Sequence, residues 1–80
     1  MSFKAKYVII DYIPIVFAET IEHKRMALVI RGTVDGAGFC YIDDNGRYHC
    51  YGESISLNVK SRGEEDAKIL NRYLGVDKEY

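Results

Sequence analysis

Two short apolar runs open the chain, and only two residues separate them. The runs cover residues 7–10 and 13–17, with Asp11 and Tyr12 between them. Their β-branched and aromatic residues favour extended backbone, so the pattern predicts two strands joined by a tight turn. Pro14 has no N–H to donate to a neighbouring strand, and we expect it at the start of its strand or on a sheet edge.

The next segment supports two interpretations. Thr20 is a candidate N-cap for a short helix over residues 21–28, because its hydroxyl can accept a bond from the first helical turn. Residues 28–30 favour a strand instead, so this alternative stays open. Glycines then mark a loop that leads into a strand. They are Gly32, Gly36 and Gly38.

The clearest local pattern is Asn45-Gly46 between two aromatic-rich runs, which predicts a β-hairpin. A two-residue turn would pair Asp44 with Arg47. A three-residue loop, with Gly46 in the left-handed conformation, would instead pair Asp43 with Arg47.

We favour the three-residue loop because it gathers apolar side chains on one face of the hairpin. That face carries Cys40, Ile42, Tyr48 and Cys50, with the two cysteines opposite one another. The other face carries Phe39, Tyr41, His49 and Tyr51.

Residues 53–60 alternate between polar and apolar, as a strand with one buried face does. This segment either continues the preceding strand past a bulge or forms a separate strand. The side chains expected to face the core are Ile55, Leu57 and Val59. The alternate positions form a polar row that continues past the strand. Its members are Ser54, Ser56, Asn58, Lys60 and Arg62.

Ser61 followed three residues later by Glu64 has the form of a capping box, which predicts a helix that ends before Gly75. The apolar stripe of this helix consists of Ala67, Leu70 and Leu74, widened by Ile69 and Tyr73. Gly75 has the position of a helix-ending C′ glycine with Val76 as its apolar contact. We expect residues 77–80 to be a frayed tail.

These elements predict an α+β fold in one domain over residues 1–80. The fold is a small antiparallel sheet of about four strands in β-β-α-β-β-α order, packed by a C-terminal helix and a short helix. A chain this short buries only about 60–65% of its unfolded surface, so extra support is common. We therefore expect a homo-oligomer.

The charge is nearly balanced, with 11 Lys and Arg against 12 Asp and Glu. A duplex-binding protein usually concentrates positive charge, so nucleic acid is the less favoured partner. No apolar stretch reaches the ~20 residues that a transmembrane helix needs. The first apolar run is too short for a signal peptide, and we expect no membrane partner and a cytoplasmic location.

Cys40, Cys50, His23 and His49 have metal-binding chemistry but not the spacing for it. Structural zinc sites use close-set ligand pairs, whereas these cysteines lie ten residues apart. We expect two buried thiols, two surface imidazoles, and neither a metal nor another cofactor. No motif brings a serine or cysteine together with a histidine as nucleophile and base, so we expect no enzyme.

The polar row is the strongest candidate for a binding site. Side chains at alternate strand positions point the same way, so Ser54, Ser56, Asn58 and Lys60 would line one face towards Arg62. That face would hold an anionic ligand such as a nucleotide, with aromatic rings beside it to stack on a base. The rings are Phe39, Tyr41 and Tyr51. An ordinary solvated sheet face has the same alternation and is the more common reason for it.

Several blocks of this chain resemble small uncharacterised proteins encoded by tailed bacteriophages and prophages. The blocks are residues 8–11 and 14–17, His23, residues 37–40, residues 52–57 and an Asp-containing C-terminal helix. The resemblance implies an accessory protein in a bacterial cytoplasm, of a kind that often counters host defences by binding. It carries no active-site residues with it.

Three functions follow as hypotheses. The first is a non-enzymatic phage-type protein that sequesters an anionic small molecule, such as a nucleotide, or blocks a host protein. The second is a small nucleic-acid-associated protein that uses Lys60 and Arg62 with Lys24 and Arg25. The third is an enzyme that acts on a small substrate.

Overall fold

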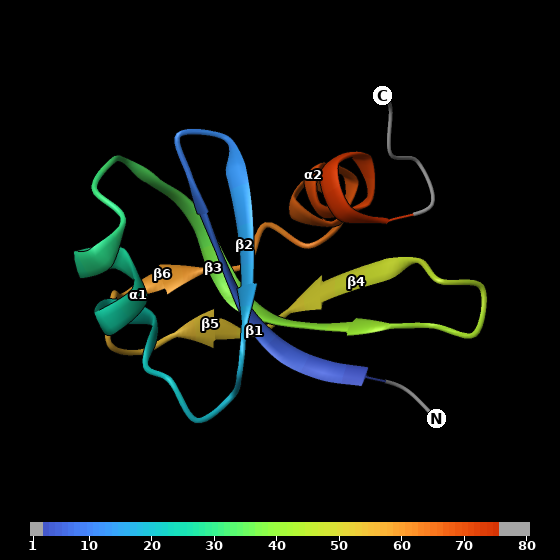
Figure 1. Ribbon diagram of the computed structural model, residues 1–80, viewed down its shortest axis with the longest axis horizontal. Helices are drawn as coiled ribbons and strands as arrows, with labels where there is room; N and C mark the ends of the chain where they lie inside the picture. The colour runs from blue at the N-terminus through green and yellow to red at the C-terminus, as the bar shows by residue number, and fades with distance from the viewer. Residues whose placement is uncertain (1–2, 76–80) are drawn as a thin grey trace.

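The computed structural model describes residues 3–75 of the chain (Figure 1). Its strands are β1 (Phe3–Ile10), β2 (Ile13–Phe17), β3 (Val34–Ile42), β4 (Tyr48–Tyr51), β5 (Glu53–Ser54) and β6 (Val59–Lys60). Its helices are α1 (His23–Val29) and α2 (Glu64–Leu74). The expected α+β fold is confirmed, and a small β5–β6 sheet accompanies the four-stranded antiparallel one.

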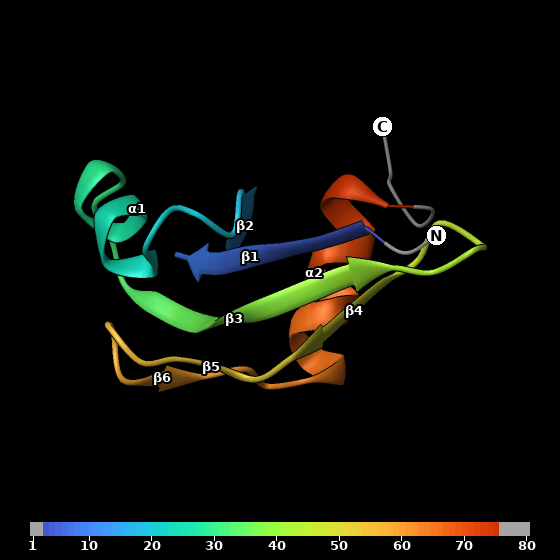
Figure 2. The same ribbon diagram turned by 90° about the horizontal axis from the view of Figure 1, so that it is seen from below.

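Strand β1 lies in the interior of the main sheet, whose order is β2-β1-β3-β4. Helix α2 covers one face of this sheet, and α1 lies on the other side of β1 (Figure 1). Figure 2 shows β5 and β6 beside β3, beyond the point where β4 ends. Both faces of β1 are therefore covered, which explains why residues 7–10 form an unbroken apolar run instead of an alternating one.

Two hydrophobic cores lie on the two faces of the sheet. The core under α2 consists of Ala5, Tyr7, Ile9, Cys40 and Leu70. The core under α1 and the β5–β6 hairpin consists of Val8, Ile10, Phe17 and Ala37. Because the sheet side chains alternate between these cores, a register slip of one residue would exchange them.

The two strand pairs predicted from local patterns are both confirmed. Asp11 and Tyr12 have φ values of 50° and 67°, which give the β1–β2 turn the left-handed backbone of a tight hairpin. Pro14 lies on β2, an edge strand, as expected. In the second hairpin the three-residue loop is correct, since the backbone N–H of Asp43 donates to the carbonyl of Arg47 at 2.9 Å.

Helix α1 differs from its prediction at both ends. It begins at His23, and Glu22 occupies the N-cap position without a side-chain hydrogen bond, so Thr20 is not the cap. It continues through Val29, which settles the open alternative in favour of a helix. Strand β3 begins at Val34, so Gly36 and Gly38 lie inside the strand and not in a preceding loop.

The predicted continuous strand over residues 53–60 is wrong. The chain forms two short strands joined by a turn at 55–58, where Asn58 has a φ of 55°. This reversal leaves Ile55 89% exposed and buries Ser54 completely, the opposite of the expected pattern. Leu57 and Val59 do pack against a core, as predicted.

Helix α2 has the predicted extent but not the predicted caps. Gly63 is its N-cap with a φ of 65°, and no side chain caps the helix. Ser61 instead accepts a bond from the Gly63 N–H at 3.0 Å, so Ser61 and Glu64 form no capping box. Gly75 has a φ of −109° and is extended, so it is not a left-handed C′ glycine. Val76 and the predicted tail lie outside the described residues.

The buried stripe of α2 is also more polar than predicted. Asp66, Leu70 and Asn71 are its buried residues, whereas Leu74 and Tyr73 are 45% and 48% exposed. The Asn71 side-chain amide lies at the edge of β4 and makes the backbone hydrogen bonds there that a neighbouring strand would otherwise make. Its oxygen accepts from the Tyr48 N–H at 2.7 Å, and its nitrogen donates to the Tyr48 carbonyl at 3.2 Å.

We predict that Asn71→Ala lowers the free energy of unfolding by about 2–3 kcal/mol, because both backbone groups of Tyr48 lose their partner in a partly buried site. Arg72→Ala, at the exposed neighbouring position, is the matched control. Urea denaturation of both variants measures the difference. Equal stability of the two variants would contradict this role for Asn71.

Candidate functional site

The polar row predicted from residues 54–62 is not a single surface. Ser54 is fully buried, and its hydroxyl oxygen accepts from the Leu57 N–H at 3.2 Å. The Ser56 hydroxyl accepts from the backbone N–H of Lys24 at 3.2 Å. Asn58 lies in the turn and Lys60 on the returning strand β6. The hydroxyl oxygens of Ser54 and Ser56 lie 3.5 Å apart. The turn at 55–58 nevertheless reverses the chain, so the five side chains do not form the row that a continuous strand would have aligned.

Arg62, the last residue of the row, forms an ion pair within the protein. Its Nε donates to Oδ1 of Asp66 at 2.7 Å, and its backbone N–H donates to Oδ2 at 3.0 Å. This carboxylate is fully buried, so it holds the arginine strongly. Arg62 is therefore a structural residue in this arrangement.

The same carboxylate joins α2 to the centre of the sheet. The Tyr7 hydroxyl donates to Oδ2 of Asp66 at 2.5 Å and lies 2.7 Å from the Ser61 hydroxyl. Burial, and next the bond to Asp66, raise the pKa of Tyr7, so this hydroxyl keeps its proton. A side chain at Gly36 would overlap the Asp66 carboxylate, so only glycine leaves room for it. The cluster is enclosed, and we assign it to stability.

The aromatic residues of the predicted site do come together, on the sheet face opposite α2. We define Phe39, Tyr41, His49 and Tyr51 as the aromatic surface. Phe39 stacks on Tyr51 with ring centroids 5.9 Å apart, and Tyr41 stacks on His49 at 4.8 Å. Tyr51 is 41% exposed, so part of its ring is open to a ligand.

Two lysines of β1 border the aromatic surface. The ammonium groups of Lys4 and Lys6 lie 5.7 and 6.0 Å from the centre of the Phe39 ring. They share a face with it because Lys4 pairs with Tyr41 and Lys6 with Phe39 in the sheet. Neither lysine belongs to the site predicted from the sequence, since no local pattern predicts which strand lies beside residues 39–41.

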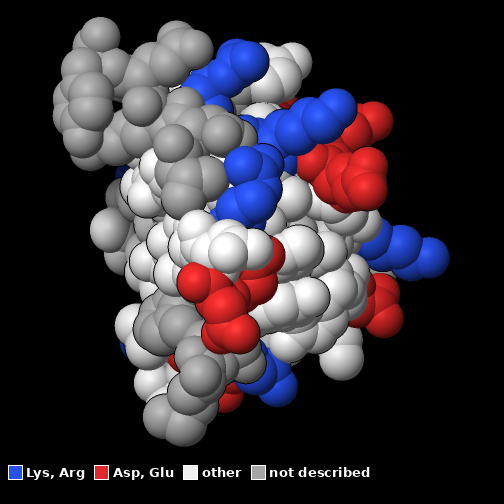
Figure 3. All heavy atoms as spheres, turned by 90° about the vertical axis from the view of Figure 1, so that its right-hand side faces the viewer, with Lys and Arg blue, Asp and Glu red and all other residues white. Residues whose placement is uncertain are grey.

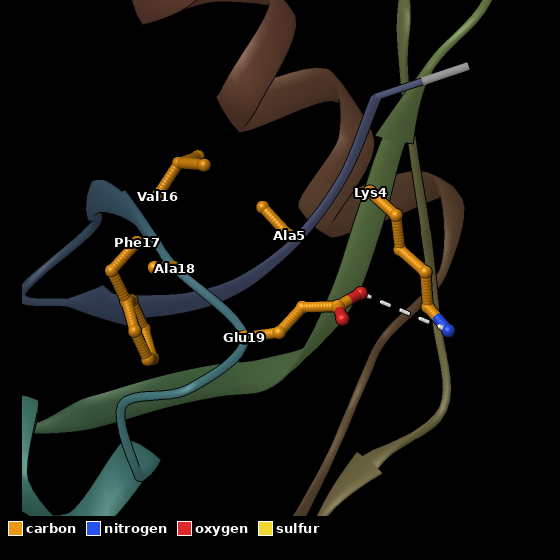
Figure 4. A pocket seen from close by; sticks show the side chains of 6 residues that line it. All are labelled: Lys4, Ala5, Val16, Phe17, Ala18 and Glu19. Atoms are coloured by element: carbon orange, nitrogen blue, oxygen red, sulfur yellow. Dashed lines mark ion pairs between the residues drawn. The ribbon is translucent and has the colours of Figure 1, made fainter. Parts of the chain in front are cut away.

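A shallow hollow of about 680 Å³ lies beside Lys4, at the end of β2. Figure 4 shows Val16 and Phe17 pointing to opposite sides of β2, while Lys4 and Glu19 extend towards one another. Lys4 and Glu19 form an exposed ion pair at 3.8 Å, which contributes little to stability. The hollow thus offers an ion-paired lysine and glutamate at the border of the aromatic surface.

A second hollow, of about 350 Å³, lies where α1 begins and adjoins the aromatic surface at Phe39. Its lining residues are Lys6, Glu22, His23, Phe39, Glu53, Ile55 and Ser56. His23 was expected on the surface but is only 4% exposed, because its ring packs edge-on between Phe17 and Phe39. The hollow is within the usual size range of small-molecule sites.

Cys40 and Cys50 face each other across β3 and β4 and are free thiols, as expected. Burial raises their pKa values to about 11 and about 12. Neither is a thiolate at neutral pH, so neither is an activated nucleophile. Within residues 3–75, no three His, Cys, Asp or Glu side chains are grouped so that they could hold a metal ion.

The charged side chains do not form a single-sign field on the side seen in Figure 3. Basic and acidic groups are interspersed there, over α2 and the tip of the β3–β4 hairpin. At the tip, Asp43 accepts from the His49 imidazole at 2.8 Å, and this bond is the main reason that the pKa of Asp43 is lowered. Of the two helices in the described part of the chain, neither has the length and apolar character to cross a membrane.

Comparisons with known proteins found no match for this chain among protein-family models, curated proteins or solved structures. The class that the fold and the site define is a small α+β protein with an aromatic, lysine-bordered sheet face.

We predict that stability falls as pH rises above roughly 8.5, where thiols of the unfolded chain ionise. The folded protein keeps these protons because the pKa values of Cys40 and Cys50 are raised to about 11 and about 12. A Cys40→Ala, Cys50→Ala variant should have a flatter profile between about pH 8 and 9.5, below the ionisation of tyrosine. Denaturation at several pH values measures both slopes, and identical slopes would contradict the assignment.

Proposed function

We propose that this protein is a non-enzymatic binding protein that holds nucleotides, free or in a single strand, on its aromatic surface. The observation that carries the proposal is the grouping of Phe39, Tyr41 and Tyr51 with Lys4 and Lys6 on one sheet face. Aromatic rings stack on bases of any sequence, and ammonium groups beside them bind phosphate.

The exposure and the neighbours of each ring determine its role in this proposal. The two lysines lie over the Phe39 ring, so a phosphate near that ring would meet both ammonium groups. One face of Tyr41 is stacked on His49, which holds the Tyr41 ring in place. Tyr51 is exposed, whereas Phe39 and Tyr41 are half-buried, so Tyr51 is the principal stacking residue in this proposal.

The alternative basic site is less well supported by the same geometry. Arg62 is bound to the buried Asp66 and Lys60 lies on a separate two-stranded sheet. Sequestering a nucleotide agrees with the phage-type role that the sequence resemblance implies. That role remains a proposal, as do the cytoplasmic location and the homo-oligomer.

The test is fluorescence anisotropy with a labelled single strand of roughly eight nucleotides, a length in the usual range for one small domain. Tyr51→Ala should weaken binding by about 5- to 150-fold, because each base–aromatic stack contributes about 1–3 kcal/mol. Lys4→Ala should weaken binding less and reduce its salt dependence. Competition by unlabelled mononucleotides shows whether a free nucleotide is sufficient.

Tyr73→Ala is the matched control, because Tyr73 is similarly exposed but lies on α2, on the opposite side of the sheet. It should bind as the wild type does. The proposal fails if the wild type binds no nucleotide, or if Tyr51→Ala and Tyr73→Ala bind equally well.

A further inference from the structure

The hollow beside Phe39 continues the aromatic surface into a pocket with a different chemistry. The aromatic surface supplies rings and ammonium groups, whereas the hollow adds two carboxylates and a buried imidazole, from Glu22, Glu53 and His23. Lys6 and Phe39 belong to both, so a ligand on the surface lies next to the hollow.

The imidazole of His23 presents a hydrogen-bond acceptor. Its Nε2 lies 2.7 Å from the Gly38 carbonyl, which can only accept, so Nε2 carries the proton. Burial lowers the pKa of His23, so the ring is neutral and Nδ1 is an unprotonated acceptor. Within residues 3–75, Nδ1 of His23 has no hydrogen-bond partner. Every buried polar side-chain nitrogen or oxygen in that range has one, so Nδ1 is not a buried atom.

The remaining polar groups of the hollow set the charge of its occupant. The carboxylates of Glu22 and Glu53 are exposed, and neither has a hydrogen bond or ion pair within the described chain. The Lys6 ammonium already donates to the Ile21 carbonyl at 3.0 Å. That bond uses one of its three N–H groups, and the ammonium keeps its positive charge. Two carboxylates against one ammonium make the hollow rich in acceptors and negative in sum, so it suits a neutral group that carries N–H donors.

We propose that this hollow binds one nucleobase by its N–H donors, with guanine preferred. This inference rests on the proposed function, because the neighbouring surface must hold the phosphate and stack the adjacent base. Guanine presents N1–H and the 2-amino group side by side, which matches the two oxygens of a carboxylate. Adenine and cytosine offer only an amino group there, and uracil offers a single N–H.

The apolar walls of the hollow fit the same occupant. The Phe39 ring forms one wall, and Ile55, which is 89% exposed, forms another. A planar base that enters the hollow covers this isoleucine and removes its apolar surface from water, which favours binding. The turn at 55–58 is what places Ile55 and Ser56 here.

The experiment measures binding of uridine-rich strands of about six nucleotides with guanine, adenine, cytosine or uracil at one central position. The guanine strand should bind about tenfold more tightly than the all-uridine strand, as one bidentate contact allows. Replacing guanine by hypoxanthine, which lacks the 2-amino group, should remove most of this preference. A Glu22→Gln, Glu53→Gln variant should bind the guanine and the all-uridine strands equally well, although the loss of two negative charges raises its affinity for both. The ratio of the two affinities within each protein is therefore the quantity compared.

Glu64→Gln, an exposed glutamate of α2 outside this hollow, is the matched control and should keep the preference. Equal binding of all four strands by the wild type would overturn this inference and leave the proposed function standing. A guanine preference that survives in the Glu22→Gln, Glu53→Gln variant would also overturn it. If no strand binds, both proposals fail.

Discussion

The carboxylate of Asp66 is a buried charge on which the position of α2 depends. It receives hydrogen bonds from Tyr7 in β1 and from the side chain and backbone of Arg62, so one group links the helix, its preceding turn and the sheet. An unpaired buried charge is strongly destabilising, so these partners must be in place together. Gly36 is required in β3 for the same reason, since any side chain there would displace the carboxylate.

Asp66 and Asn71 hold α2 on one face of the sheet. The proposed function depends on which side chains of the other face are exposed. Helix α1 and the β5–β6 hairpin cover only the end of that face near Val8 and Ile10. The remaining end carries the aromatic surface and its two lysines, and α1 reaches this surface at Phe39 through the ring of His23. Burial of one face by α2 thus leaves a face with exposed rings on the other side.

Local patterns predicted most of the fold, and they predicted the rings of the site but not the lysines beside them. The Asn45-Gly46 turn and the cysteine positions were sufficient for the correct hairpin register, and so for the grouping of Phe39, Tyr41 and Tyr51. The polar row failed because period-two alternation does not reveal a chain reversal at Asn58. Lys4 and Lys6 were missed, and His23 was wrongly expected on the surface, because their positions depend on long-range strand pairing and helix docking. The burial of Asp66 could have been predicted, because this residue lies on the buried stripe of α2 one turn before Leu70.

The most direct test is an NMR titration of the ¹⁵N-labelled protein with a short single strand that contains one guanine. The account predicts that amide shifts change in residues 4–6, 39–41 and 49–51, and in the hollow at 22–23 and 53–56. Amides of α2 between 64 and 74 should stay unchanged, because they lie behind the sheet. Changes centred on α2, or no changes at all, would contradict the claim that the open sheet face is the binding surface.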